Sequence, residues 1–353
     1  MAKQLIKGNE AIAEAAIQAG CRFFFGYPIT PQNQIPEYMS KRMPQVGGCF
    51  LQAESEVSAI NMVYGASGAG ARVMTSSSSP GISLKQEGIS YIACAGLPCV
   101  IVNMVRSGPG LGGILPSQSD YFQAVKGGGH GDYKLIVYAP ASVQEAADMV
   151  MHAFDASDFY RVPVMILGDG MIGQMMEPVE FRQQKKMDLP EKTWALTGWD
   201  GKSRERAIIN SLHIEPQEMY DVCLDMKKIY DEIEKNETDF EEYLMDDASI
   251  CLVAYGTTAR ICKVAINRAR EQGIKAGLIR PKTLWPFPTE PISAAADKVD
   301  AFLAVEMSMG QMVEDVKIAV NGKKPVKFYG KTGGVIPHYK EILNEIIAIK
   351  EGK

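Results

Sequence analysis

The sequence predicts an α/β protein of two domains, each with a mostly parallel sheet flanked by helices. Helical patterns alternate with short apolar runs over residues 1–170, and the same rhythm begins again at Ser249. These apolar runs are continuous rather than alternating, which indicates strands that are covered on both faces. The length of 353 residues exceeds one typical domain and agrees with a division into two.

The first domain is expected to begin with a helix from Asn9 to Ala19, because Asn9 can cap its start and Gly20 can end it. The apolar run from Arg22 to Gly26 follows as the first strand. Further strands are predicted over residues 49–52, 72–75, 99–105, 134–138 and 162–167, and further helices over residues 82–95 and 142–156.

A change in composition after Glu180 marks the end of the first domain. Polar runs at residues 183–186 and 202–206 interrupt the apolar rhythm, and residues 218–247 are charged and prone to form a helix. The expected organisation is a first domain over residues 1–180, a polar and helical linker arm over residues 181–248, and a second domain over residues 249–353.

The second domain repeats the alternation of strands and helices. Its strands are predicted over residues 250–255, 275–279, 302–305 and 326–329, and its helices over residues 257–272 and 339–350. No internal repeat relates the two domains.

Composition excludes several classes of function. Hydrophobic residues make up 46% of the chain and its net charge is −5, as in an ordinary soluble globular protein. The chain has no basic excess that would favour nucleic acid or an acidic membrane surface. Residues 1–20 are amphipathic without an uninterrupted apolar run, so we expect neither a signal peptide nor a transmembrane helix, and we expect a cytoplasmic protein.

The cysteines and histidines do not form a metal-binding pattern. No CxxC pair occurs, and the four histidines are far apart without metal-ligand spacing. We expect reduced, mostly buried thiols and no metal site on this chain, so that any iron–sulfur cluster would belong to another chain. The cysteines in question are Cys21, Cys49, Cys94, Cys99, Cys223, Cys251 and Cys262.

A carboxylate in an unusual position is the first candidate for chemistry. In a helix that begins near Glu56, residues Ala59, Ile60 and Val63 follow three, four and seven positions later, so Glu56 lies on the apolar stripe that faces the interior. A buried, unpaired carboxylate costs on the order of several kcal/mol or takes up a proton, so it usually has a partner or a function. The alternative is an acid that extends to solvent at the helix start, where the helix dipole stabilises negative charge.

Three loops after predicted strands are candidates for a site, because ligands of open parallel sheets bind beyond the carboxyl ends of the strands. In the first, Tyr27-Pro28-Ile29-Thr30-Pro31, two prolines fix the backbone and present the Thr30 hydroxyl rigidly. An ordinary turn into a helix that begins at Pro31 is the alternative. The second loop, Thr75 to Gly81, contains four serines that could hold an anion or cap the following helix, and capping is the simpler interpretation.

The third loop, Arg106 to Gly113, contains the spacing GxGxxG. A dinucleotide site needs this motif to open a helix, whereas the prolines in this segment predict that the loop continues, so no nicotinamide site is expected. Arg106 ends a buried strand, where it could form a bidentate pair with a carboxylate or a salt bridge to a neighbouring loop.

The segment Gly168-Asp169-Gly170 resembles half of a cofactor motif. Thiamine diphosphate enzymes bind Mg²⁺ and the diphosphate with GDG and an asparagine further along the chain, both of which offer oxygen ligands. The next asparagine here is Asn210, beyond the change in composition. We therefore interpret this segment as a strand end and a turn.

Four segments in this order resemble one family: the Tyr27 to Pro31 loop, the helix that contains Glu56, Ala59 and Gly65, the Arg106 to Pro109 loop, and residues 278–288 (LIRPKTLWPFP). The chain resembles the α-type subunit of 2-oxoacid:ferredoxin oxidoreductases, and within that family the branched-chain (3-methyl-2-oxobutanoate) type. The similarity runs over essentially the whole chain, including residues 305–312 (VEMSMGQM).

The resemblance implies a fold and a set of partners. Residues 1 to 180 would form the pyrimidine-binding domain of a thiamine diphosphate enzyme, and residues 249–353 a transketolase C-terminal-like domain. A separate β-type subunit would bind the diphosphate and Mg²⁺, while γ and ferredoxin-like subunits would hold the iron–sulfur clusters. The chain would act only in this heteromeric complex, which would also contain homo-oligomeric contacts.

The resemblance also implies roles for individual residues. Glu56 would hydrogen-bond N1′ of the aminopyrimidine and promote the imino tautomer that deprotonates C2 of the thiazolium. Thr30 would hydrogen-bond the carboxylate or oxo group of the substrate, and Arg106 would pair with that carboxylate. The residues implied in binding the cofactor are Tyr27, Pro28, Ile29, Glu56 and Gly81. Relatives often have TxTSGPG in place of Thr75 to Gly81, so the role of this loop stays open.

The implied reaction is the oxidative decarboxylation of 3-methyl-2-oxobutanoate, in which CO₂ leaves, coenzyme A takes the acyl group and ferredoxin takes the electrons. The alternatives are 2-oxoglutarate or pyruvate as the substrate, or a non-catalytic scaffold subunit. A second cationic group that faces the distal end of the substrate would favour 2-oxoglutarate, and none can be located from the sequence.

Overall fold

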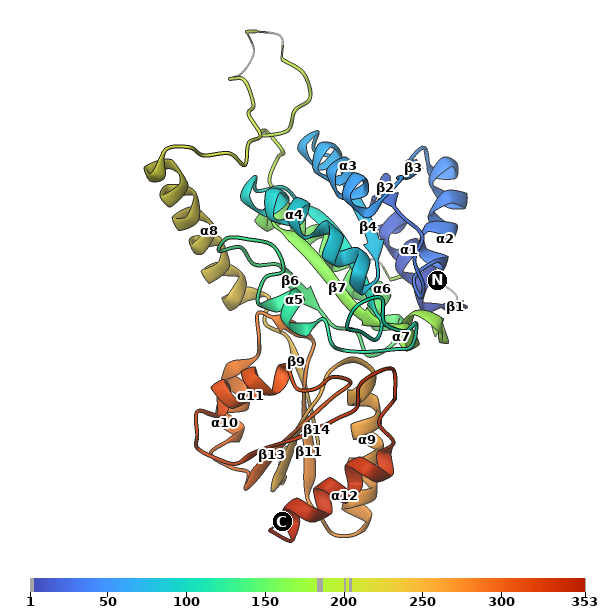
Figure 1. Cartoon of the computed structure of the whole chain (residues 1–353), viewed down its shortest axis with the longest axis vertical. Coiled ribbons are helices and arrows are strands. Elements are labelled where there is room, and N and C mark those ends of the chain that lie inside the picture. Colours follow the sequence, from blue (N-terminus) through green and yellow to red (C-terminus); the bar gives the residue numbers. More distant parts are fainter. Residues whose placement is uncertain (1–2, 183–186, 200, 203–204, 353) are drawn as a thin grey trace.

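The computed structural model describes residues 3–182, 187–199, 201–202 and 205–352. Two large sheets organise the described chain, and each carries helices on its faces (Figure 1). All neighbouring strands in these sheets are parallel except for one antiparallel edge strand in each. The prediction of an α/β fold with mostly parallel sheets is confirmed.

The first sheet has seven strands in the order β12-β6-β7-β5-β4-β2-β3. Every strand predicted for the first domain is present, two of them with the predicted bounds, because a continuous apolar run marks a strand buried on both faces. The bounds are β2 Phe23–Gly26, β3 Cys49–Gln52, β4 Val73–Ser77, β5 Cys99–Val105, β6 Ile136–Tyr138, β7 Pro163–Asp169 and β12 Thr283–Trp285.

Helices cover this sheet, and two of them lie side by side above its centre, α3 and α4 (Figure 1). A second pair, α1 and α6, is also in close contact. The short strands β1 and β8 form an antiparallel ribbon beside the sheet. The bounds are β1 Gln4–Lys7, α1 Gly8–Gln18, α2 Gln34–Arg42, η1 Met43–Val46, α3 Glu56–Gly68, α4 Ser79–Cys94, α5 Tyr121–Val125, α6 Val143–Tyr160, α7 Gly170–Gln174 and β8 Met176–Val179.

The second sheet has five strands in the order β14-β13-β10-β11-β9. Its parallel strands and its two longest helices occur where the sequence predicts them, while α10 and α11 are additions. The bounds are α8 Pro216–Asn236, β9 Phe240–Tyr243, β10 Ile250–Val253, α9 Gly256–Glu271, β11 Ala276–Pro281, α10 Thr289–Ala295, β13 Ala301–Glu306, α11 Met312–Val320, β14 Val326–Gly330 and α12 Tyr339–Lys350.

The expected helical linker differs from the structure at its end. The helix stops at Asn236, and residues 240–243 form the strand β9, which pairs antiparallel with β11. Glu241 lies opposite Arg280 in this pair, and a cross-strand charge pair stabilises a strand whose sequence is otherwise polar. Residues 183–186, 200 and 203–204 of the linker lie outside the described residues.

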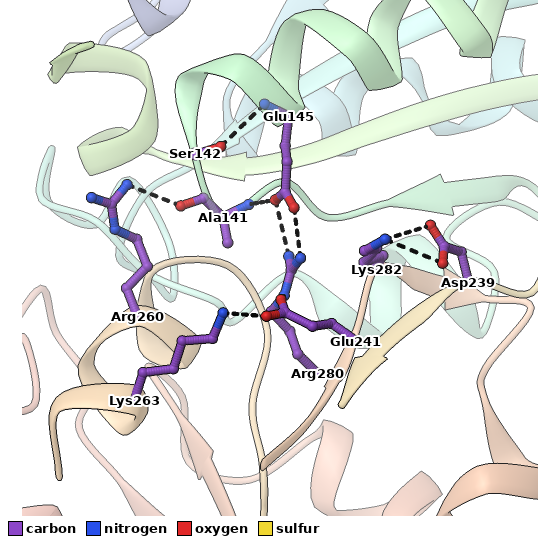
Figure 2. A network of polar contacts seen from close by, with 9 residues as sticks. All are labelled: Ala141, Ser142, Glu145, Asp239, Glu241, Arg260, Lys263, Arg280 and Lys282. Atoms are coloured by element: carbon purple, nitrogen blue, oxygen red, sulfur yellow. Dashed lines mark hydrogen bonds and ion pairs between the residues drawn. The ribbon is translucent and has the colours of Figure 1, made fainter. Parts of the chain in front are cut away.

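A network of charged side chains joins the two halves of the structure, which are the part around the first sheet and the part around the second sheet (Figure 2). Arg280 is buried and donates to Glu145 on α6 at 2.6 Å and to Glu241 on β9 at 2.7 Å. Lys263 also contacts Glu241, and Arg260 donates to the carbonyl of Ala141 at 3.1 Å. The two halves therefore meet through paired charges around a groove as well as through apolar packing in a shared core.

None of the helices in the described ranges combines the length and the apolar character that a membrane crossing requires.

Candidate functional site

The loops with candidate residues follow four adjacent strands of the first sheet. These strands are β3, β2, β4 and β5, and all four run parallel. Their carboxyl ends therefore open at one edge, as expected for a ligand site in such a sheet. Glu56 follows β3, Thr30 follows β2, Gly81 follows β4 and Arg106 follows β5.

Glu56 is the first residue of α3 and faces the interior. The Ser55 hydroxyl caps this helix by accepting from the Ser58 backbone N–H at 3.2 Å. Only 6% of Glu56 is exposed, and Ala59 on the same stripe is fully buried, whereas Glu54 is exposed. The predicted burial of Glu56 is thus confirmed, and the alternative of an acid that extends into solvent is wrong.

The carboxylate of Glu56 lies against the start of α4. A β-carbon at residue 81 would lie 2.6 Å from Oε1 of Glu56 and 2.1 Å from Oγ of Ser77, so only glycine fits here. Within the described residues no group donates a hydrogen bond to this carboxylate. Glu56 is therefore a buried acceptor without a protein donor, an arrangement that a ligand N–H or a proton would complete.

The serine loop does not cap α4 through its side chains. Ser78 occupies the N-cap position, but its hydroxyl makes no capping hydrogen bond, so the capping interpretation is wrong at this residue. The hydroxyls of Ser77 and Ser78 are buried without a hydrogen-bond partner in the described chain. The backbone N–H of Ser79 instead donates to Oδ1 of Asn103 on β5 at 3.2 Å. These two unpaired hydroxyls, of which that of Ser77 lies at the contact between Gly81 and Glu56, are further polar groups available to a ligand.

The loop after β2 is held by a buried glutamine. Gln32 is fully buried, donates to the Tyr27 carbonyl at 3.2 Å and accepts from the Ser76 hydroxyl at 2.5 Å. Because α2 begins only at Gln34, Pro31 is not a first helical residue, and the alternative of a simple turn into a helix at Pro31 is wrong. The Thr30 residue is left exposed.

The other candidates of this loop lie between the interior and the surface. Tyr27 and Ile29 are half-buried and Pro28 is exposed. All three belong to the loop after β2, whose position Gln32 fixes, and β2 pairs with β4.

Arg106 is buried without a counterion. Its Nη1 donates to the carbonyl of Thr30 at 3.0 Å and its Nη2 to the carbonyl of Leu111 at 2.9 Å. Nε has no hydrogen-bond partner, and no carboxylate lies within 4 Å of the guanidinium anywhere in the described residues. The alternative of a salt bridge to a neighbouring loop is therefore wrong, and a charged group remains available to an anionic ligand.

Contacts connect the candidate residues into one site. The Ser79 hydroxyl donates to the Arg106 carbonyl at 3.2 Å and accepts from the Arg106 N–H at 3.1 Å, so the loop that holds Gly81 adjoins the loop that holds Arg106. Arg106 in turn contacts Thr30, and Gly81 contacts Glu56. The structure thus gathers the predicted residues at one edge of the sheet.

Lys85 is a further charged residue beside Glu56 that was not predicted. It is fully buried in α4, and Nζ donates to the Thr75 hydroxyl at 2.7 Å and to the Ser76 carbonyl at 3.0 Å. Burial lowers the pKa of Lys85 to about 7, and the negative charge of Glu56 opposes this shift. The sequence did contain a signal, because Lys85 shares a helical stripe with Ile82, Ile89 and Ile92, just as Glu56 does with its apolar neighbours.

The GDG segment has a structural role. Asp169 ends β7 and caps α7 by accepting from the backbone N–H groups of Met171 at 2.9 Å and Ile172 at 3.2 Å. Burial raises the pKa of the Asp169 carboxyl. The interpretation as a strand end is confirmed, and the segment continues into a short helix rather than a simple turn.

The cysteines differ in exposure. Four are buried, two are half-buried and Cys49 is exposed, and all seven are free thiols.

Comparisons with known proteins find family models and relatives that match this chain. A family model described as "Pyruvate flavodoxin/ferredoxin oxidoreductase, thiamine diP-bdg" matches residues 14–242, and one described as "Pyruvate:ferredoxin oxidoreductase core domain II" matches residues 248–342. The ketoisovalerate oxidoreductase subunit VorB of Methanothermobacter marburgensis is 49% identical over 98% of this chain and 97% of its own length.

Solved structures agree in fold. The 2-oxoglutarate:ferredoxin oxidoreductase of Magnetococcus marinus, solved with 2-oxoglutarate, coenzyme A and succinyl-CoA, superimposes with a TM-score of 0.85 at 24% identity. The match covers 99% of this chain and 65% of that one. A split-gene transketolase, as an inactive β4 tetramer, superimposes with a TM-score of 0.59 at 13% identity over 97% of both chains. These likenesses confirm a thiamine diphosphate-binding fold followed by a transketolase-like domain.

Proposed function

Since this chain belongs to the 2-oxoacid:ferredoxin oxidoreductases, we propose that it supplies the pyrimidine half of a thiamine diphosphate site in an enzyme that oxidises ketoisovalerate (3-methyl-2-oxobutanoate). The observation that carries this proposal is the buried carboxylate of Glu56, which lies against Gly81 and has no donor of its own within the described chain.

The residues around Glu56 suit an aminopyrimidine ring. Such a ring needs one carboxyl group at N1′ and polar partners for its remaining nitrogen atoms. Glu56 would provide the carboxyl group, the unpaired hydroxyls of Ser77 and Ser78 are further partners, and Gly81 leaves space where a side chain would intrude. Tyr27 and Ile29 would line the same pocket from the loop after β2.

When bound, thiamine diphosphate supplies the nucleophilic carbon and the electron sink for decarboxylation. The task of this chain is to exchange a proton at Glu56 with N1′. Burial excludes water from that carboxylate, so that its proton passes to the cofactor rather than to solvent.

The substrate carboxylate would bind Arg106. Its guanidinium has an unused Nε donor, and a carboxylate would supply the missing negative charge. The Thr30 hydroxyl, on the loop that Arg106 contacts, would donate to the same carboxylate or to the oxo group.

The three loops favour a substrate with an apolar side chain. Arg106 is the only basic residue in residues 26–32, 75–81 and 106–119, so they offer no second cation for the distal carboxylate of 2-oxoglutarate. The loop beyond Arg106 instead exposes Leu111, Ile114 and Leu115. The 49% identity to a ketoisovalerate oxidoreductase subunit supports the same choice.

The remaining parts of the enzyme would come from partner subunits. We propose a β-type subunit for the diphosphate and Mg²⁺, and γ and ferredoxin-like subunits for the iron–sulfur clusters. The incomplete GDG motif and the scattered cysteines of this chain support that division.

Viologen reduction by the assembled complex tests the proposal. The complex should be given thiamine diphosphate, Mg²⁺, coenzyme A and, in turn, 3-methyl-2-oxobutanoate, 2-oxoglutarate and pyruvate. We expect the highest kcat/KM with 3-methyl-2-oxobutanoate. A preference for 2-oxoglutarate would overturn the substrate assignment, and no reduction with any of the acids would overturn the enzymatic role.

A further inference from the structure

Lys85 lies between the two helices that form the Glu56 site. Gly81, Lys85 and Gly88 follow one another at intervals of four and three residues, so they occupy one face of α4. That face meets α3, because Gly81 contacts Glu56 and a β-carbon at residue 88 would lie 2.5 Å from Cγ2 of Ile60. The two glycines bring the helices close together and enclose the lysine.

The environment of the ammonium group is polar but short of negative charge. Nζ donates two of its three hydrogens, to the Thr75 hydroxyl and the Ser76 carbonyl, which are both neutral. The titratable groups that influence it are Glu56 on α3 and the thiol of Cys99 on β5. Burial raises the pKa of Cys99 to about 12, so this thiol stays neutral and Glu56 is the partner left to consider.

Lys85 and Glu56 form no ion pair within 4 Å and share no hydrogen bond among the described residues, so their interaction acts through space. In an interior of low dielectric constant, a cation at this position stabilises a nearby carboxylate more than it would in water. A buried lysine without such a partner would be costly to retain.

We propose that Lys85 is a positioning residue that acts through Glu56, because its ammonium group stabilises the carboxylate form of that side chain. This inference rests on the proposed function for its consequence. When Glu56 gives its proton to N1′, the carboxylate that remains is the form that Lys85 stabilises, so the transfer becomes more favourable.

The contacts of Lys85 with Thr75 and Ser76 also connect it to the loop after β2 that carries Thr30. Ser76 donates to Gln32, and Gln32 donates to the Tyr27 carbonyl. The same buried network therefore holds the lysine beside Glu56 and fixes the loop that carries Thr30.

The first experiment measures Glu56 directly in the full chain without cofactor. The carboxyl stretching band in the infrared, assigned by its loss in Glu56→Gln, is followed against pH in the unsubstituted chain and in Lys85→Met. Methionine has a similar length and no charge. We expect the titration midpoint of Glu56 to rise by about one pH unit in Lys85→Met. An unchanged midpoint would overturn the proposal.

Ile89→Val is the matched control, because Ile89 is equally buried on the same stripe of α4 and its loss changes packing without changing charge. The Glu56 midpoint should stay constant in this variant. A shift in the control as large as that in Lys85→Met would mean that packing, not charge, sets the midpoint.

A second measurement serves if Lys85→Met does not fold. The coupling between two titrating groups is reciprocal, so Glu56→Gln should lower the titration midpoint of Lys85 by a similar amount, as followed by NMR of chains with ¹³C-labelled lysine. An unshifted lysine midpoint would also overturn the proposal.

Turnover in the assembled complex separates this inference from the proposed function. Lys85→Met should lower kcat about tenfold and leave KM for the 2-oxoacid unchanged, because Arg106 is untouched. Equal losses in kcat and in substrate affinity would indicate a general structural role instead. If the unsubstituted complex reduces no viologen, the proposed function fails, while the infrared titration still decides on Lys85.

Discussion

Nη1 of Arg106 donates a hydrogen bond to the backbone carbonyl of Thr30 at 3.0 Å. This contact joins the loop after β5 to the loop after β2, across the intervening strand β4. The guanidinium thereby holds the residue proposed to contact the substrate, while its own charge stays unpaired within the described chain. Binding and loop position are therefore coupled through one side chain.

Replacing Arg106 by lysine tests its proposed role in binding the substrate carboxylate. A lysine keeps the charge but loses the planar fork that bonds Thr30 and a carboxylate together. We expect KM for the 2-oxoacid to rise by about 10- to 100-fold in the reconstituted complex, because losing one or two charge-assisted hydrogen bonds weakens binding by about that factor. Steady-state viologen reduction measures it.

Arg161→Lys is the control for that variant. Arg161 also donates to a backbone carbonyl, that of Gly96 at 3.0 Å, and lies over the ring of Trp194, but it caps the far end of α6. KM for the 2-oxoacid should be the same in Arg161→Lys as in the unsubstituted complex. An equal rise in both variants would contradict a direct role of Arg106 in binding.

Glu56→Gln should abolish most of the turnover. The amide keeps the shape of the side chain but cannot exchange a proton with N1′, so we expect kcat to fall by about 10²- to 10⁴-fold. Gel filtration should show that the partner subunits still assemble. Glu54→Gln, two residues earlier and exposed, should retain full activity. Full activity in Glu56→Gln would remove this residue from the mechanism.

Much of this site follows from residue patterns, because the signals are local. A carboxylate on an apolar stripe and rigid loops at strand ends identified Glu56, Thr30 and Arg106. The partners of these residues come from segments far apart in the chain, so no pattern reports them. The pairing of Arg106 with the Thr30 carbonyl and the orphaned hydroxyl of Ser77 are tertiary facts.

Four strands escaped prediction, β1, β8, β9 and β12, and the last two did so for a related reason. β9 is polar and follows a helix-prone run, and β12 has only three residues between prolines. Each is a strand only because a neighbouring strand offers it hydrogen bonds, β11 for β9 and β6 for β12. Lys85 is a different case, since the criterion that selected Glu56, a charged residue on the apolar stripe of a helix, selects it as well.

The stability of the isolated chain should depend on pH through Lys85. Its pKa is lowered to about 7 in the folded chain, against an ordinary value of 10.5. Between pH 7 and pH 9 the unfolded state therefore binds more protons at this site, and stability gained from this residue rises with pH, by up to about 1.4 kcal/mol per unit. Below pH 7 the contribution is constant.

Urea unfolding of the unsubstituted chain and of Lys85→Met at pH 7, 8 and 9 checks this. Groups remote from Lys85, such as His152 with its raised pKa, titrate equally in both chains, so the difference reports Lys85 together with the Glu56 carboxylate coupled to it. The free energy of unfolding of Lys85→Met, relative to that of the unsubstituted chain, should fall as the pH rises from 7 to 9. A difference independent of pH would mean that Lys85 keeps an ordinary proton affinity.

Arg280→Met should weaken the junction between the two halves. Arg280 is 2% exposed in its side chain and holds two carboxylates, Glu145 and Glu241, which are about 30% exposed (Figure 2). Because solvent reaches these partners, we expect a loss of about 2 kcal/mol rather than the larger cost of a fully buried pair.

Lys227→Met removes an exposed pair with Asp231 on α8 and should change stability by less than about 0.5 kcal/mol. Thermal unfolding of both variants provides the comparison. Equal midpoints for Arg280→Met and the unsubstituted chain would show that the charged network does not hold the two halves together.

The strand β12 has a consequence for how this protein can be divided. It comes from the second half of the sequence but closes the edge of the first sheet beside β6, by pairing with Val137 and Tyr138. A fragment cut near residue 248 would leave β6 as an open edge, which invites pairing with other chains. The two halves are thus not interchangeable modules, and a gene fusion or domain exchange at that boundary should give an aggregating product unless it carries residues 283–285 along.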